Sequence, residues 1–106
     1  MFELLADEYA RAILTATSDE AKSATMLAQH LDAAQSTVYS RINHLQELGL
    51  LTEATQVTRD GNHYAMYRAN LERLDVELTA DGFNLRVEPK DRDAAADRLR
   101  ELWRGL

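Results

Sequence analysis

Residues 24–51 read ATMLAQHLDAAQSTVYSRINHLQELGLL, and this stretch decides the fold. Apolar residues at three- and four-residue spacing predict a helix over residues 24–31, with Ser23 as its N-cap. A second helix follows after a short break, and Gly49 stands where a C-capping glycine belongs. The inner face of that second helix is formed by Val38, Ile42, Leu45 and Leu48. Two helices joined by so short a turn predict a helix-turn-helix over residues 24–48.

Upstream, residues 2–17 are predicted to form one amphipathic helix, because apolar residues recur at three- and four-residue intervals. They are Phe2, Leu5, Tyr9, Ile13 and Ala16. Downstream, the composition changes to Thr, Val and Tyr around Asp60-Gly61, a dipeptide typical of tight hairpin turns. We therefore predict a two-stranded wing over residues 52–69. Pairing outward from a two-residue turn sets Val57 opposite Tyr64, Thr55 opposite Met66, and Glu53 opposite Arg68 as an ion pair.

A second hairpin is predicted over residues 74–88, around Asp81-Gly82. Apolar pairs would share one of its faces and an ion pair the other, so we expect this hairpin to bury one side. Pro89 ends it, because proline has no amide hydrogen to continue the ladder. Outward pairing sets Leu78 opposite Leu85, Glu77 opposite Arg86, and Val76 opposite Val87.

Residues 91–105 are predicted to close the chain as an amphipathic helix. Its apolar stripe consists of Ala95, Leu99, Leu102, Trp103 and Leu106. The predicted order is three helices, two hairpins and a last helix, all in one domain over residues 1–106. The fold class is α+β and mainly helical: a winged helix-turn-helix with an extra β-hairpin and a C-terminal helix.

The composition excludes several classes of function. The chain has no cysteine, which removes disulfides, thiolate metal ligands and cysteine nucleophiles. No apolar run is long enough to span a bilayer and the N-terminus lacks a basic region, so we expect a cytoplasmic protein with no membrane partner. No glycine-rich phosphate loop or nucleophile motif occurs, so we expect neither enzyme activity nor a cofactor.

The chain carries 18 acidic against 12 basic residues, a formal net charge of −6, and its only lysines are Lys22 and Lys90. An acidic, lysine-poor surface is typical of proteins from cells with molar internal salt, although a mildly acidic mesophilic protein has the same balance. The negative charge argues against simple electrostatic adhesion to nucleic acid.

The helix-turn-helix resembles the ArsR type found in prokaryotic regulators. That family commonly has a pattern close to L-A-x-x-L followed by S-T-V-Y-x-R-I-x-x-L-x-x-L-G-L, which residues 27–31 and 36–50 follow. Residues 60–63 and 67–69 of the wing, and the later hairpin, are most similar to haloarchaeal members. The resemblance covers nearly the whole chain and implies a transcription regulator that binds double-stranded DNA.

Two positions depart from the family pattern. Asp32 stands where the turn usually has glycine, but aspartate tolerates a left-handed backbone better than most residues, so the turn can still form. Ala34 stands where the next helix needs a cap and has no side-chain oxygen, which costs about 1 kcal/mol. The start of that helix either frays until DNA binds or is shifted along the chain.

We call residues 35–48 the reading helix, because the side opposite its apolar face displays polar groups suited to a DNA major groove. The predicted contacts to bases and phosphates are Gln35, Ser36, Thr37, Tyr39, Ser40, Arg41, Asn43 and His44. Wing-tip residues Arg59, Asn62 and His63 would reach the minor groove or the backbone beside it. For any single residue, a solvated helix face explains the same pattern.

The positions of the acidic residues favour DNA contact for the segment as a whole. Residues 33–46, 54–59 and 61–71 contain no Asp or Glu. The span 33–71 has three acidic and three basic residues, so the other 67 residues carry the whole charge of −6. Carboxylates are thus sparse where phosphates would repel them.

The resemblance also implies a homodimer built by the first and last helices. Its interface would contain Leu5, Tyr9, Leu99, Leu102, Trp103 and Leu106. Docking of the last helix onto the first within one chain is the alternative. A dimer would place two reading helices about 34 Å apart on a pseudo-palindromic site.

No metal site is predicted. The three histidines, His30, His44 and His63, fall on different predicted elements, and a hydrated acidic face accounts for Asp93, Asp97 and Glu101. Two other functions stay open: a winged-helix protein-interaction module, for which a charge of −6 is comfortable, and an architectural DNA-binding protein.

Overall fold

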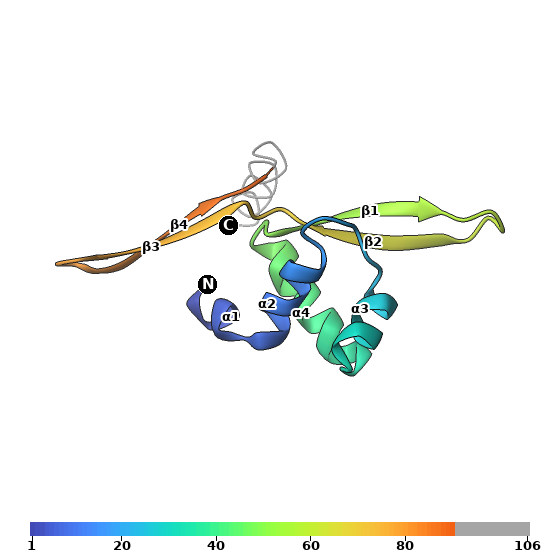
Figure 1. Cartoon of the computed structure of the whole chain (residues 1–106), viewed down its shortest axis with the longest axis horizontal. Helices are drawn as coiled ribbons and strands as arrows, with labels where there is room; N and C mark the ends of the chain where they lie inside the picture. The colour runs from blue at the N-terminus through green and yellow to red at the C-terminus, as the bar shows by residue number, and fades with distance from the viewer. Residues whose placement is uncertain (91–106) are drawn as a thin grey trace, which may run out of the picture.

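The computed structural model describes residues 1–90, which form four helices and two antiparallel hairpins (Figure 1). The helix predicted over 91–105 lies outside these residues. The elements are α1 (Phe2–Ala6), α2 (Glu8–Ala16), α3 (Ala24–Leu31), α4 (Gln35–Glu47), β1 (Leu51–Val57), β2 (His63–Ala69), β3 (Arg73–Thr79) and β4 (Gly82–Glu88). Strand β1 pairs with β2, and β3 pairs with β4, in two separate sheets. The arrangement is an α+β fold consistent with a winged helix-turn-helix.

The core lies where α2, α3 and α4 meet the base of the β1–β2 hairpin. Its largest fully buried apolar side chains are Ile13, Leu27, Val38, Ile42, Leu45 and Leu50. Burial of each such side chain stabilises the fold by about 1.5–3 kcal/mol, so this cluster holds the helices together. The predicted inner face of α4 is confirmed at Val38, Ile42 and Leu45, while Leu48 is half-buried at the edge of the cluster. None of the helices within residues 1–90 is long and apolar enough to cross a membrane.

The prediction of one helix over residues 2–17 is wrong, because the helix is interrupted at Asp7. The Asp7 backbone is extended, with φ −78° and ψ 122°, and its carboxylate accepts a hydrogen bond from the Ala10 amide at 2.9 Å. An aspartate that captures a free amide in this way ends one helix and begins another. The break also changes which residues are buried: Leu4, Ala10, Ile13 and Leu14 enter the core, and Phe2 is exposed.

The wing forms as predicted, but its register differs by one residue. The observed partners include Val57 with His63 and Glu53 with Tyr67. The reason is the loop: the Thr58 amide donates to the Asn62 carbonyl at 2.9 Å, and Gly61 has φ +83°, so three residues form the turn instead of two. A shift of one residue places Glu53 and Arg68 on opposite faces of the hairpin, so the predicted ion pair between them is wrong.

The register of the second hairpin differs from the prediction by two residues. Ala80 and Asp81 form its turn, and Thr79 pairs with Gly82, which has φ +126°. A shift of two residues preserves the two faces, so the apolar pairs still share one side: Leu74 with Val87, Val76 with Leu85, and Leu78 with Phe83. The expected burial of that side is wrong within the described residues, because Val76, Leu78 and Phe83 are exposed.

A short bridge that the sequence did not predict fixes the wing to the helices. Lys22 and Tyr67 exchange two backbone hydrogen bonds, of 2.9 and 2.8 Å, between the loop before α3 and strand β2. Beside this bridge, the Ala69 amide donates to the carbonyl of buried Thr17 at 3.1 Å. The wing therefore leaves the helices at a set angle, and Figure 1 shows the two hairpins extending in opposite directions.

Substitution of Asp7 separates its two roles, as the N-cap of α2 and as the partner of Arg41 at 2.9 Å. We expect Asp7→Ala to lower the free energy of unfolding by about 1.5 kcal/mol, because both roles are lost. Asp7→Asn should lower it by about 0.5 kcal/mol, because asparagine still caps a helix. Urea denaturation at pH 7 measures both values, and equal losses would contradict the separation.

The same pair of proteins tests the pH dependence. The hydrogen bond from Arg41, the amide of Ala10 and the nearby guanidinium charge hold the pKa of Asp7 below 3.8. The stabilisation is therefore fully present above pH 3.8 and disappears as the pH falls through the lower pKa of the folded state. The difference in stability between wild type and Asp7→Asn should shrink over that range.

Candidate nucleic-acid interface

The turn between α3 and α4 forms despite the absence of glycine. Ser23 caps α3 by accepting a hydrogen bond from the Met26 amide at 3.2 Å, as predicted. At the other end Asp32 adopts the left-handed conformation with φ 50°, and the Ala33 amide donates to the Ala28 carbonyl at 3.1 Å. Asp32 therefore supplies the backbone conformation that glycine would otherwise provide.

Helix α4 has an uncapped start and a well-closed end. It begins at Gln35 after Ala34, whose backbone is extended and which supplies no side-chain hydrogen bond, so the helix start is not shifted along the chain. At the other end Gly49 has φ +75°, its amide donates to Gln46, and the Leu50 amide donates to the Leu45 carbonyl at 2.9 Å. This pair of bonds is a Schellman motif, which turns the chain directly into β1.

The outer face of α4 carries most of the predicted DNA contacts together. The exposed side chains are Gln35, Ser36, Tyr39, Ser40, Asn43 and His44, and Thr37 is half-buried at the flank. Tyr39 keeps 46% of its surface exposed in the middle of this face. Over residues 35–46 the face offers amide, hydroxyl and phenol groups and no carboxylate, which is the chemistry that base edges and phosphates accept, and exposed Glu47 follows at the last position of the helix.

Arg41 is held away from this face by an ion pair that the sequence analysis did not predict. Its Nε and Nη2 atoms contact the Asp7 carboxylate at 3.0 and 2.9 Å, and both side chains are half-buried. Contact between Arg41 and a phosphate would require the guanidinium to share or leave this pair. The signal for the pair was weak, because the two residues lie 34 positions apart.

The wing tip is organised around Asp60. Its carboxylate accepts hydrogen bonds from the Thr58 hydroxyl, from the Asn62 amide at 3.2 Å, and from the Asn62 side chain at 2.9 Å. These bonds, the one from Thr58 first, lower the pKa of Asp60. Arg59 and His63 flank the loop with exposed side chains. The wing tip therefore presents a cation beside a carboxylate that is already bonded to its own loop.

A second carboxylate lies between α4 and the wing. Glu53 on β1 accepts a hydrogen bond from the Gln46 side chain at 3.1 Å and is paired across the sheet with Tyr67. Burial raises the pKa of Tyr67, and the negative charge of Glu53 adds to the effect. Residues 35–46 of α4 thus contain no carboxylate, while exposed Glu47 ends the helix and Glu53 lies at its border with the wing.

The histidines do not form a metal site with neighbouring acids in this part of the molecule. Across residues 1–90 the structure gathers no group of three His, Cys, Asp or Glu side chains that could hold an ion. His44 lies on α4 and His63 begins β2, on separate elements of the proposed contact surface.

Comparison with known proteins agrees with this geometry. Residues 5–54 match a family model described as a helix-turn-helix domain. The matched range begins in α1 and ends in β1, so it contains the turn at Asp32 and the whole of α4. A search of curated proteins found no match. This part of the chain is therefore similar to a helix-turn-helix domain, and the similarity indicates DNA binding and a role in transcription regulation.

The missing cap of α4 leads to a test. Ala34→Ser should raise the free energy of unfolding by about 1 kcal/mol, because Ala34 already has the extended backbone of an N-cap and lacks only the acceptor oxygen. Ala34→Asp should stabilise the helix similarly but add a carboxylate at the edge of the contact face, which phosphates would repel. Urea denaturation and fluorescence anisotropy with duplex DNA measure the two effects. Stabilisation without weaker binding in Ala34→Asp would place this edge away from DNA.

Proposed function

We propose that this protein is a sequence-specific transcription regulator that binds double-stranded DNA, with α4 in the major groove and the wing beside it. The observation that carries the proposal is the outer face of α4, where the exposed polar side chains of residues 35–46 gather without a carboxylate in a chain of net charge −6, and Glu47 follows only at the end of the helix. We further propose that it is an ArsR-like, haloarchaeal, cytoplasmic protein without catalytic activity. In this proposal it binds a pseudo-palindromic site as a homodimer.

The charge distribution supports direct readout over general adhesion. With Arg41 bonded to Asp7, the exposed cations of the contact surface within the described residues are Arg59 and Arg68 on the wing. Two cations release few counterions from DNA, so affinity must come from hydrogen bonds and fit in the groove. Gln35 and Asn43 carry amides that can pair with adenine, and Ser40 lies between them in sequence.

A single added carboxylate tests the orientation of α4. Ser40→Asp should weaken binding to an operator duplex by about tenfold or more, because the new charge faces bases and phosphates. Asn84→Asp on the exposed surface of β4 is the matched control, since it adds the same charge away from the proposed surface. Its affinity should stay within about twofold of wild type. Fluorescence anisotropy measures both, and equal losses in the two variants would contradict the proposed orientation.

The operator for that assay comes from mapping the protein across its own genome. Discrete promoter peaks are the expected result. Uniform coverage would instead indicate an architectural protein, and the absence of peaks would indicate a protein-interaction module.

The small number of free cations predicts weak salt dependence. A plot of log affinity against log salt should have a slope of about −2 per bound chain, and operator binding should persist in molar KCl. Anisotropy titrations from low to molar KCl measure the slope. Binding restricted to low salt would contradict the proposal that hydrogen bonds and fit dominate the affinity.

A further inference from the structure

The β3–β4 hairpin presents an apolar face that no described element covers. Val76, Leu78 and Phe83 expose 54, 70 and 64% of their surfaces, and they share this face with Leu74 and Leu85. Together they form a patch on the order of 400 Å², within the range at which exposed apolar surface marks an interaction site. A two-stranded hairpin is at best marginally stable in water unless another layer packs on it.

Only the base of this hairpin is attached to the rest of the described chain. Val87 packs against the edge of the core, the Glu72 amide donates to the Glu88 carbonyl at 2.8 Å, and Lys90 Nζ donates to the Ser18 carbonyl at 2.6 Å. Neither strand packs extensively on a described helix, and Figure 1 shows the hairpin projecting away from them. The exposed part of the face therefore lies toward the tip, where a partner has unobstructed access.

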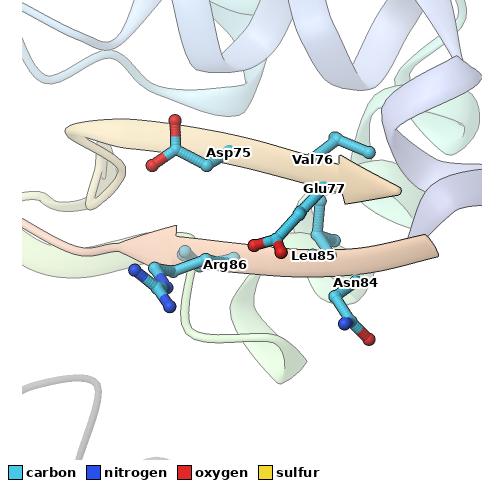
Figure 2. A pocket seen from close by; sticks show the side chains of 7 residues that line it. Asp75, Val76, Glu77, Asn84, Leu85 and Arg86 are labelled. Atoms are coloured by element: carbon cyan, nitrogen blue, oxygen red, sulfur yellow. The ribbon is translucent and has the colours of Figure 1, made fainter. Parts of the chain in front are cut away.

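The opposite face of the hairpin is polar and needs no partner. Arg73 and Asp75 form an ion pair at 2.9 Å, and Asp75 lies opposite Arg86 across the strands. Figure 2 shows the charged side chains of Asp75, Glu77 and Arg86 along the two strands. They line a hollow of about 670 Å³ together with Asn84 and the apolar residues Val76, Leu85 and Val87. Charged side chains along both strands discourage edge-to-edge pairing, which leaves the apolar face as the surface for association.

We propose that a second copy of this chain covers the apolar face, so that two hairpins pack face to face about a two-fold axis. The proposal rests on the proposed function, which requires two reading helices for a pseudo-palindromic site, and it names the surface that joins them. It adds β3–β4 to the terminal helices as an interface element. In the described part of those helices, Leu5 and Tyr9 are half-buried.

The area and the geometry fit two copies. Two such patches bury on the order of 800 Å², and a specific interface needs about 1,000 Å². Helix α1 lies at the same end of the molecule and exposes 48% of Phe2, so it can supply part of the remaining area. Each strand spans about 23 Å, so antiparallel overlap separates the two hairpin bases by a similar distance. The wing points the other way (Figure 1), so association leaves the DNA surface free.

The test is the mass of the full chain in solution, measured by light scattering and sedimentation equilibrium. We expect wild type to be a dimer, and Leu78→Asp to weaken dimerisation by about 100-fold, because a charge would be buried against the apolar face of the partner copy. Asn84→Asp on the polar face adds the same charge and should leave the dimer intact. A monomeric wild type, with the face covered by residues 91–106 or by another protein, would overturn the proposal, as would a Leu78→Asp protein that remains dimeric.

Cross-linking gives a second measurement that does not depend on a destabilising charge. The chain contains no cysteine, so Val76→Cys introduces a single thiol in the middle of the apolar face and Asn84→Cys introduces one on the polar face. A short bifunctional maleimide should link two copies of Val76→Cys and not of Asn84→Cys. Equal yields in the two variants would contradict face-to-face packing.

Measurements of DNA binding distinguish a failure of this inference from a failure of the proposed function. If both hold, Leu78→Asp should still bind a half-site duplex as a monomer while losing cooperative binding to the full site. Dimerisation through the hairpin without any DNA binding would contradict the function alone. Operator binding by a dimer that Leu78→Asp does not disturb would contradict the inference alone.

Discussion

The burial of one face of α4 is the constraint on which the proposed DNA surface depends. Val38, Ile42 and Leu45 are fully inaccessible to solvent, packed among α2, α3 and the base of the wing. Successive helix side chains point about 100° apart, so these three residues fix the direction of every other side chain on the helix. Removing even one such side chain from a core costs about 2–5 kcal/mol, which makes a different rotation of α4 inaccessible. An apolar core thus orients a polar face.

Asp7 connects the N-terminal part of the chain to this helix. The same carboxylate ends the first helical segment, caps α2 and pairs with Arg41 on the flank of α4. The ion pair fixes α2 against α4, and it also holds the Arg41 guanidinium away from the contact surface. The hydrogen-bonding groups of that surface therefore outnumber its free charges.

Periodicity predicted the helix-turn-helix well because helix faces are repeated over many residues. The bounds of α3, the Ser23 cap, the left-handed Asp32 and the buried face of α4 all follow from local patterns of this kind. The break at Asp7 did not, since the apolar spacing continues through it while the competing hydrogen bond is made by a single side chain. The pairing of Arg41 depends on the tertiary fold, and no local pattern encodes it.

The two hairpins show why strand register and strand burial are harder to predict. Both hairpins contain Asp-Gly, but Gly61 ends a three-residue loop whereas Gly82 begins strand β4. The same dipeptide therefore led to register errors of one residue in the first hairpin and two residues in the second. Alternation identified the two faces of β3–β4 correctly, because a shift of two residues preserves them. It could not tell what would cover the apolar face.

The difference between the hairpins lies in what each one packs on. Strand β2 is bridged to Lys22, and Tyr67 and Ala69 are buried in the core, so the first hairpin obtains its third layer from its own chain. The second hairpin has the same length and a more regular alternation of apolar residues, but within residues 1–90 it obtains such a layer only at Val87. Since the same physical requirement applies to both, the second hairpin is the part of the described chain where association has the most apolar surface to bury.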